Sequence, residues 1–173
     1  LPNPPDLKAV EQTLVSLAKL PGFGQAMATI VSDQQANAQQ QNLAAILLRE
    51  LSVGKYWAMD PDTSFVVPDA EKESIRQVIV NGLLSSISVV RIQSATAIAH
   101  IGSMDWPEQW PGLLDQLLKW ASGDAPVQGD MRNLVIDGAL RTLVYFTEHI
   151  GSDHIIPASR VILPVILAVW RDV

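Results

Sequence analysis

The chain has 173 residues, of which 48% are hydrophobic and 17% are charged. This composition excludes an intrinsically disordered chain and indicates a large buried core. The net charge of −6 offers no basic surface to phosphate groups, so direct nucleic-acid binding is disfavoured and a basic protein partner fits better.

The N-terminal segment predicts two helices separated by Pro21-Gly22. Asp6 suits the N-cap of the first helix. The second helix is expected over residues 23–32, and we expect the two helices to form an antiparallel pair. The apolar stripe of the first helix consists of Leu7, Val10, Leu14 and Leu17.

A second pair of helices is predicted around a long loop. Its first helix covers about residues 36–51 and ends at Gly54, and the loop continues to Pro68. Asp69 can cap the helix that follows. We expect the first helix to bury Leu43, Ile46, Leu47 and Leu51, and the second to bury Ile75, Val78, Ile79 and Leu83.

A third pair follows, with a helix over 88–104 and another from Pro107 to about residue 122. Pro107 suits the first turn of a helix, where its missing N–H costs nothing. The aromatic residues here can form a partner-binding patch or fill the core, and we favour the core because large rings prefer burial. This structural motif consists of Trp106, Pro107, Trp110 and Pro111.

Two further helices run from Met131 to Ile150 and past Pro157 to Trp170. The sequence therefore predicts eight helices in four consecutive pairs, and no segment alternates as a strand does. The spacing of roughly forty residues is the period of HEAT and armadillo repeats. The predicted fold is all-α: an α-solenoid of about four HEAT repeats with antiparallel-paired helices.

The chain starts at Leu1 and ends with an apolar run from Val161 to Trp170. We expect it to be an excerpt of a longer array in which further helices cover this run. Pro164 interrupts the run, and spanning a bilayer needs about 20 apolar residues, so we expect no membrane insertion.

No pattern of catalytic, cofactor-binding or metal-binding residues is present. Cysteines are absent, and His100, His149 and His154 lie outside any HExxH arrangement. Gly54-Lys55 lacks the other residues of a phosphate-binding loop. The carboxylates are scattered, so we expect them to lie on solvent-facing helix surfaces. The chain is therefore not expected to be an enzyme.

Several motifs in order resemble the N-terminal end of the importin-β, or karyopherin-β, nuclear transport receptors. They are Val10-Glu11 through Leu14, Pro21-Gly22-Phe23, Asn42 to Arg49 with Trp57, and Ile98-Ala99 followed by Trp106 to Leu114. Residues 99–101, Met131-Arg132 and Thr147-Glu148 are similar to the importin-nine branch. The resemblance implies an importin-β N-terminal-type domain at 1–57, with HEAT 1 and the first helix of HEAT 2, and further HEAT repeats at 58–173.

This resemblance implies a receptor that carries cargo through the nuclear pore, exchanges it on binding Ran-GTP, and shuttles between cytoplasm and nucleus. Its cargo would be basic proteins such as histones or ribosomal proteins, and it would also touch phenylalanine-glycine repeats of nucleoporins. In the family, the second helices of the first repeats meet Ran, which here means about 23–32, 69–84 and 108–122. The candidate contact residues are Gln25, Thr29, Glu73, Gln77, Asp115, Gln116 and Lys119.

Two alternatives to an import receptor stay open. An export receptor of the same superfamily would bind cargo only together with Ran-GTP. A static HEAT-repeat scaffold would share every repeat feature and show no binding that depends on the nucleotide state.

Overall fold

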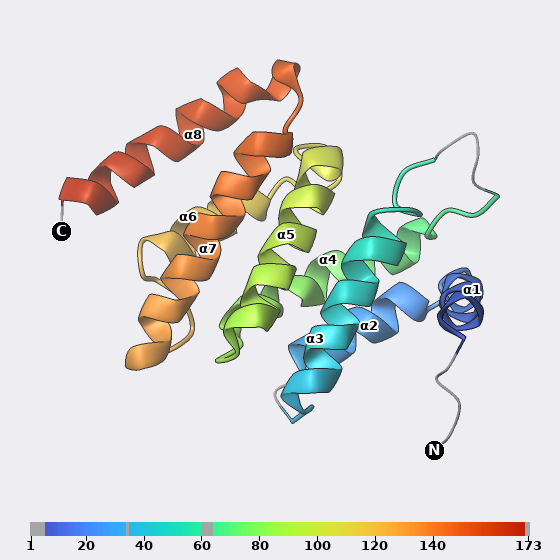
Figure 1. The fold of residues 1–173 in the computed structure, drawn as a ribbon. Helices are drawn as coiled ribbons and strands as arrows, with labels where there is room; N and C mark the ends of the chain where they lie inside the picture. Colours follow the sequence, from blue (N-terminus) through green and yellow to red (C-terminus); the bar gives the residue numbers. More distant parts are fainter. Residues whose placement is uncertain (1–5, 34, 60–63, 172–173) are drawn as a thin grey trace.

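The computed structural model describes residues 6–33, 35–59 and 64–171, which form eight α-helices and no β-strand (Figure 1). The helices are α1 (Leu7–Leu17), α2 (Phe23–Ser32), α3 (Ala38–Leu47), α4 (Asp69–Ile79), α5 (Ser88–Asp105), α6 (Leu113–Ala121), α7 (Asp130–His149) and α8 (Ser152–Arg171). A π-helical segment, η1 (Leu48–Val53), continues α3, and a 3-10 segment, η2 (Val80–Leu84), continues α4. The all-α prediction is confirmed.

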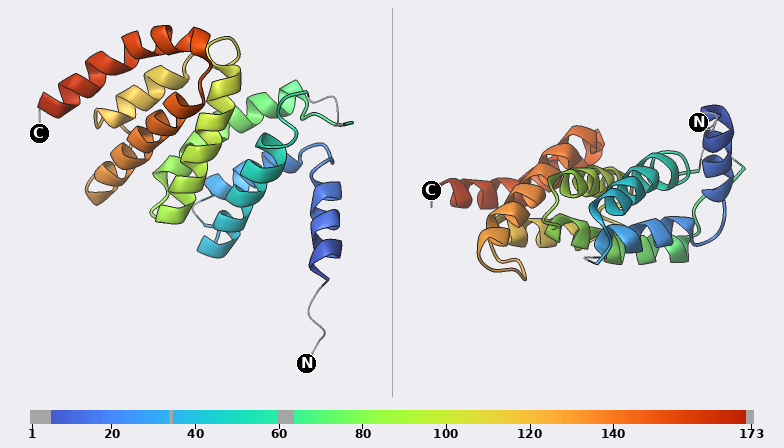
Figure 2. Two further views of the ribbon diagram at one scale, coloured as in Figure 1. Left: turned by 45° about the horizontal axis from the view of Figure 1, so that its top comes forward. Right: turned by 60° about the horizontal axis from the view of Figure 1, so that its bottom comes forward.

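The helices stack in two layers, as an α-solenoid requires (Figure 2). One layer contains α3 with η1, α5 and α7, which pack side by side in chain order. The other contains α2, α4 with η2, and α6, and α8 packs beside α6. Each layer covers the apolar faces of the other.

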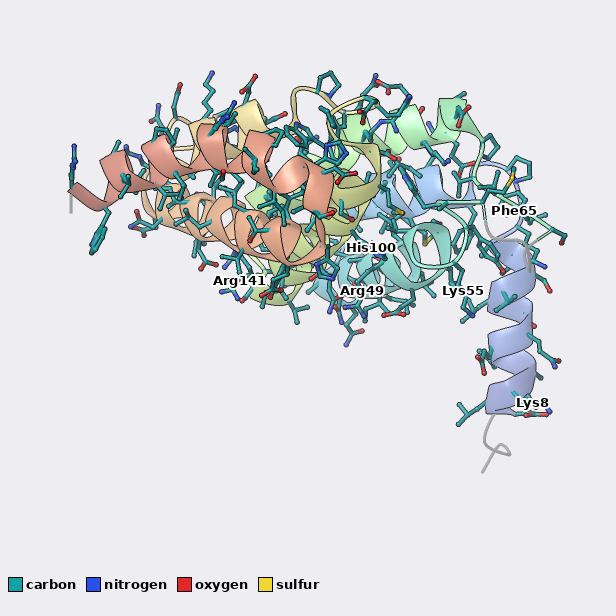
Figure 3. All side chains as sticks on the ribbon, turned by 90° about the horizontal axis from the view of Figure 1, so that it is seen from above. Lys8, Arg49, Lys55, Phe65, His100 and Arg141 are labelled. Atoms are coloured by element: carbon teal, nitrogen blue, oxygen red, sulfur yellow. The ribbon has the colours of Figure 1, made fainter. Side chains whose placement is uncertain are left out.

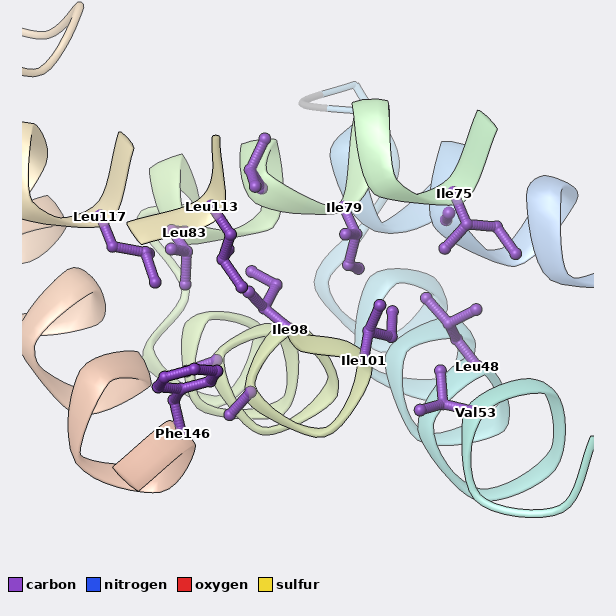
Figure 4. Packing of buried hydrophobic residues seen from close by; sticks show 14 of the residues in the cluster. Leu48, Val53, Ile75, Ile79, Leu83, Ile98, Ile101, Leu113, Leu117 and Phe146 are labelled. Atoms are coloured by element: carbon purple, nitrogen blue, oxygen red, sulfur yellow. The ribbon is translucent and has the colours of Figure 1, made fainter. Parts of the chain in front are cut away.

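Large side chains from both layers fill the space between them (Figure 4). Leu48 and Ile98 meet Ile75 and Leu113 from the opposite layer, and Phe146 extends this core towards α7. All five are almost completely buried. Burial on this scale contributes about 25 cal/mol for each Å² of apolar surface removed from water, and it is what stabilises the stack.

Local capping interactions fix several helix starts. The Asp6 side chain accepts a hydrogen bond of 3.1 Å from the backbone N–H of Lys8, which confirms Asp6 as the N-cap of α1. Asn37 and Gln40 form a reciprocal capping box at the start of α3. The Gln-rich segment therefore begins a helix through its own side chains.

The prediction that α1 and α2 form an antiparallel pair is wrong. α1 runs alongside none of the other described helices and projects from the end of the molecule (Figure 3). Its C-terminal half contacts the core through Leu14 and Val15, and Ala18, directly after the helix, is buried. The rest of its apolar stripe stays in solvent.

The expected burial of the α3 stripe is also wrong in part. Leu43 is 57% exposed, Ile46 and Leu47 are half-buried, and Leu51 is buried. The physical reason is that α1 does not lie against this face of α3. The outer side of the first layer therefore keeps apolar side chains in contact with water.

The expectation that Pro107 begins a helix is wrong, because α6 starts at Leu113. The backbone N–H groups of Gln109 and Trp110 both donate to the carbonyl oxygen of Asp105, at 2.7 and 3.0 Å, which closes a turn. Pro111 also disfavours helical backbone at the residue before it. The segment 106–112 is thus a compact connector between α5 and α6.

The C-terminal helix α8 is largely exposed and contains Pro157 and Pro164. Only Ala158 and Ile162 are buried in it. By length and composition alone, it is the one helix in the described residues that could cross a membrane.

Candidate partner-binding surface

The outward sides of α2, α4 and α6 form the α2–α4–α6 face, which carries the seven predicted contact residues. Gln116 is half-buried and the other six, Gln25, Thr29, Glu73, Gln77, Asp115 and Lys119, are exposed. The three helices belong to one layer of the solenoid (Figure 2). Residues 44 or more positions apart in the sequence, such as Thr29 and Glu73, therefore share one surface.

The α2 part of this face is anchored on α4 by the carboxylate of Glu71. Its Oε2 accepts from the backbone N–H of Gly22 at 2.8 Å, and its Oε1 accepts from that of Gln25 at 3.2 Å. A carboxylate at a helix N-terminus satisfies free N–H groups and interacts favourably with the helix dipole. Gln25 and Thr29 are therefore held on a helix whose start is tied to its neighbour.

On α4, the Glu73 carboxylate is oriented by two donors from the same helix. Nη2 of Arg76 lies 2.9 Å from Oε2, and Nε2 of Gln77 donates to Oε1 at 2.9 Å. These hydrogen bonds from Arg76 and Gln77 lower the pKa of Glu73 from its ordinary value and outweigh the effect of burial. Glu73 thus presents a fixed negative charge to solvent.

Behind Glu73 lies a buried polar network that sequence reasoning missed. Nη1 of Arg76 donates to Oδ2 of Asp105 at 2.6 Å, and Nε1 of Trp57 donates to Oδ1 at 3.0 Å. The sequence predicts carboxylates on solvent-facing surfaces, yet Asp105 is 7% exposed and Glu71 is 8% exposed. Each buried carboxylate accepts hydrogen bonds from donors on another element, and no local sequence pattern reveals such donors.

The charge of Arg76 is maintained inside this network. Burial on its own lowers the pKa of Arg76, but the hydrogen bonds with Glu73 and Asp105 raise it above the ordinary value. The guanidinium therefore stays cationic and links the exposed carboxylate of α4 to the buried one at the end of α5.

The α6 part of the face is less ordered by internal contacts. Nζ of Lys119 lies 3.5 Å from Oδ2 of Asp124, and both side chains are well exposed. An ion pair of this kind contributes about 0–1 kcal/mol in water. Lys119 and Asp115 can therefore reorient towards a partner at little cost.

The aromatic motif lies mainly on the core side. Trp106 is buried and meets the Phe146 ring edge-to-face at 5.9 Å between centroids. Trp110 is half-buried against the core, Pro107 is half-buried, and Pro111 is exposed. Trp106 thereby joins α7 and the 106–112 connector.

The described residues contain no group of three or more His, Cys, Asp or Glu side chains that could hold a metal ion. The rings of His100 and His149 lie 6.0 Å apart between centroids. Burial, followed by the neighbouring His149, lowers the pKa of His100 from its ordinary value. The α2–α4–α6 face offers a broad polar surface for a protein partner, since solenoids bind through area contributed by successive repeats.

Comparison with known proteins shows what this chain is similar to. Residues 10–85 match the Importin-beta N-terminal domain. The chain is 28% identical over 142 residues to exportin-2 of Pagrus major, covering 82% of this chain and 14% of that protein. It is 27% identical over 117 residues to the importin-alpha re-exporter of Schizosaccharomyces pombe, covering 67% of this chain and 12% of that protein.

A solved structure gives a similar result. The chain matches Lph2, described as a novel bidirectional nuclear transport receptor in S. cerevisiae, with a TM-score of 0.72 and 26% identity. The match covers 94% of this chain and 16% of that one, so the chain spans a small part of the proteins it resembles. Together these matches support the importin-β superfamily. The importin-nine branch is not supported, because these relatives are of the exportin type.

Proposed function

We propose that this chain, as part of an importin-β superfamily nuclear transport receptor, binds Ran-GTP through the α2–α4–α6 face. The observation that carries the proposal is the match of residues 10–85 to the Importin-beta N-terminal domain. This range includes α2, α4 and η2, and with them Gln25, Thr29, Glu73 and Gln77.

The direction of transport is proposed to be export. Two relatives are named exportin-2 and importin-alpha re-exporter, and the structural relative is described as bidirectional. An export receptor binds cargo and Ran-GTP together, so each raises the affinity for the other by the same factor. By the name of the second relative, importin-α is the first cargo to test.

Binding of Ran loaded with a non-hydrolysable GTP analogue or with GDP, at two salt concentrations, tests the proposal. Selective binding of the GTP form supports a transport receptor, and equal binding of both forms, or none, supports a static scaffold. With importin-α added, tighter Ran-GTP binding indicates export and weaker binding indicates import. Binding of other basic cargo and of nucleoporin repeats, and shuttling through the nuclear pore, stay predictions.

Two substitutions map the face. Thr29→Arg and Gln77→Arg place bulky cations on α2 and α4 at exposed positions. We expect each to weaken Ran-GTP binding by about tenfold or more, which corresponds to about 1.4 kcal/mol. Glu148→Arg, exposed on α7 in the other layer, is the matched control and should bind normally. Equal losses in all three variants would place the contact elsewhere.

A further inference from the structure

Two histidines from consecutive helices of one layer meet at one end of the molecule. His100 lies near the C-terminal end of α5, and His149 is the last residue of α7. The two helices pack side by side and end on the same side of the fold (Figure 1). Their imidazole rings are 6.0 Å apart between centroids, with 41° between the ring planes. The pair therefore bridges two helices at a place outside the α2–α4–α6 face.

A close contact between α5 and α7 fixes the backbone on both sides of the pair. A Cβ added to Gly102 of α5 would stand only 3.2 Å from Cδ2 of Phe146 of α7, and Phe146 is completely buried. His100 comes two residues before Gly102, and His149 comes three residues after Phe146. The two imidazoles are thus carried by helices whose separation is set by close packing.

The protonation of both rings suits the binding of a metal ion. Nδ1 of His149 lies 2.7 Å from the backbone carbonyl oxygen of Tyr145, which can only accept, so Nδ1 carries the proton. The neutral ring then keeps its lone pair on Nε2, and such a carbonyl partner commonly orients a metal-bound histidine. Burial, followed by the neighbouring His149, lowers the pKa of His100 from its ordinary value of 6.5, so its ring is neutral at physiological pH.

We propose that His100 and His149 form a two-histidine site for a divalent transition-metal ion of the Zn²⁺ kind, which favours imidazole ligands. Two imidazoles that share one zinc ion through bonds of about 2.0 Å have centroids roughly 5–6 Å apart, and the observed 6.0 Å lies at the upper end of that range. A small rotation of the exposed His149 side chain closes the difference. Water completes the coordination, because the described residues place no third His, Cys, Asp or Glu beside the pair.

A bound ion at this site clamps α5 to α7 and stabilises the folded chain. Positions 100 and 149 are far apart in the sequence, so the unfolded chain does not hold the two rings together. The ion therefore binds the folded state in preference and should raise the thermal unfolding midpoint.

Calorimetric titration of the 173-residue chain with Zn²⁺, in a buffer that does not chelate the ion, tests the site. We expect one ion per chain, and we expect His100→Gln and His149→Gln each to weaken binding by at least about tenfold. His154→Gln is the matched control, because it removes the third histidine, which packs against Trp106, and should keep full affinity. Failure of the parent chain to bind Zn²⁺ up to about 1 mM, or equal losses in all three variants, would overturn the proposal.

The unfolding midpoint and the identity of the bound nitrogen give two further readouts. Zn²⁺ should raise the midpoint of the parent chain and of His154→Gln, and it should leave that of His149→Gln unchanged. His149 is exposed, so its replacement preserves the fold. Long-range ¹H–¹⁵N NMR should show coordination through Nε2 of His149, and coordination through Nδ1 would contradict the geometry. These measurements do not involve Ran, so their outcome is independent of the proposed function.

Discussion

The indole Nε1 of Trp57 donates a 3.0 Å hydrogen bond to Oδ1 of Asp105, although 48 positions separate the two residues. Oδ2 of the same carboxylate accepts from Arg76 of α4 at 2.6 Å. Asp105 is also the last residue of α5, and its carbonyl oxygen closes the turn that leads to α6. One residue therefore joins the loop after η1, the helix α4 and the 106–112 connector.

Replacement of Asp105 with alanine should destabilise the protein strongly. The change leaves Nη1 of Arg76 and the Trp57 N–H without their acceptor in the interior, although Arg76 keeps its ion pair with Glu73, and it costs about 3–5 kcal/mol. Urea unfolding followed by circular dichroism measures the free energy of unfolding. Asp115→Ala, at an exposed position on α6, should change it by less than about 0.5 kcal/mol. Similar losses in both variants would contradict the role given to the buried network.

Gly82→Ala should separate η2 from α5. A Cβ at position 82 would stand 2.8 Å from the Cβ of Ser94 and 3.0 Å from Cγ1 of Val31, and the Cβ of Ser94 cannot move without its backbone. We expect a loss of about 1–3 kcal/mol in unfolding free energy. Gly112→Ala is the control, because its φ is −81° and nothing lies within 4 Å of the added carbon. That change should be neutral or slightly stabilising.

Glu71→Ala should weaken the attachment of α2 to α4. It removes the acceptor of two backbone N–H groups at the start of α2, with an expected cost of about 1–2 kcal/mol. In hydrogen-exchange measurements, the variant should exchange faster than the parent chain at the backbone N–H groups of Gly22 and Gln25. The increase at the start of α7 should be smaller. Glu11→Ala on α1 removes an exposed carboxylate and should leave these rates unchanged.

His100 predicts a pH dependence of stability. Its pKa is lowered by burial and, to a smaller extent, by His149, from an ordinary value of 6.5. Between this lowered pKa and about pH 6.5, the unfolded chain therefore binds more protons than the folded chain. The contribution of neutral His100 is present above that pH and is lost as the pH falls through its lowered pKa.

Denaturation midpoints measured in His100→Gln across this range should fall less steeply at acidic pH than in the parent chain. His149→Gln removes only the second of the two causes, so it should flatten the profile by a smaller amount. A parent profile that is identical to that of His100→Gln would show that this histidine does not titrate differently in the two states.

Local sequence determined the helices. The apolar spacing and the Pro21-Gly22 stop lead to α2 at 23–32 as predicted, and the Asp6 cap lies where its side chain can reach the N–H of Lys8. The repeat spacing also predicted the α-solenoid. These features depend on residues within a few positions of one another, so periodicity and capping rules detect them.

Some boundaries depended on contacts between distant residues. Sequence reasoning began a helix at Pro107, whereas the turn at Asp105 delays α6 until Leu113. It predicted surface carboxylates, whereas Glu71 and Asp105 are buried against donors from α2, α4 and the Trp57 loop. No spacing rule reports a partner that lies 46 or 48 positions away.

The features of the candidate surface also divide into those that the sequence determined and those that depended on tertiary contacts. The sequence by itself determined that α2, α4 and α6 have polar outer sides, because the opposite sides carry the apolar stripes. Only the tertiary structure decided that Arg76 donates a hydrogen bond to Glu73 from the buried side. It also decided that α1 leaves open the apolar groove between α2 and α3, which includes Met27, Ile30 and Leu43. The physical reason is that helix formation is local, whereas the pairing of buried charges and the docking of a helix depend on which surfaces meet after the chain has folded.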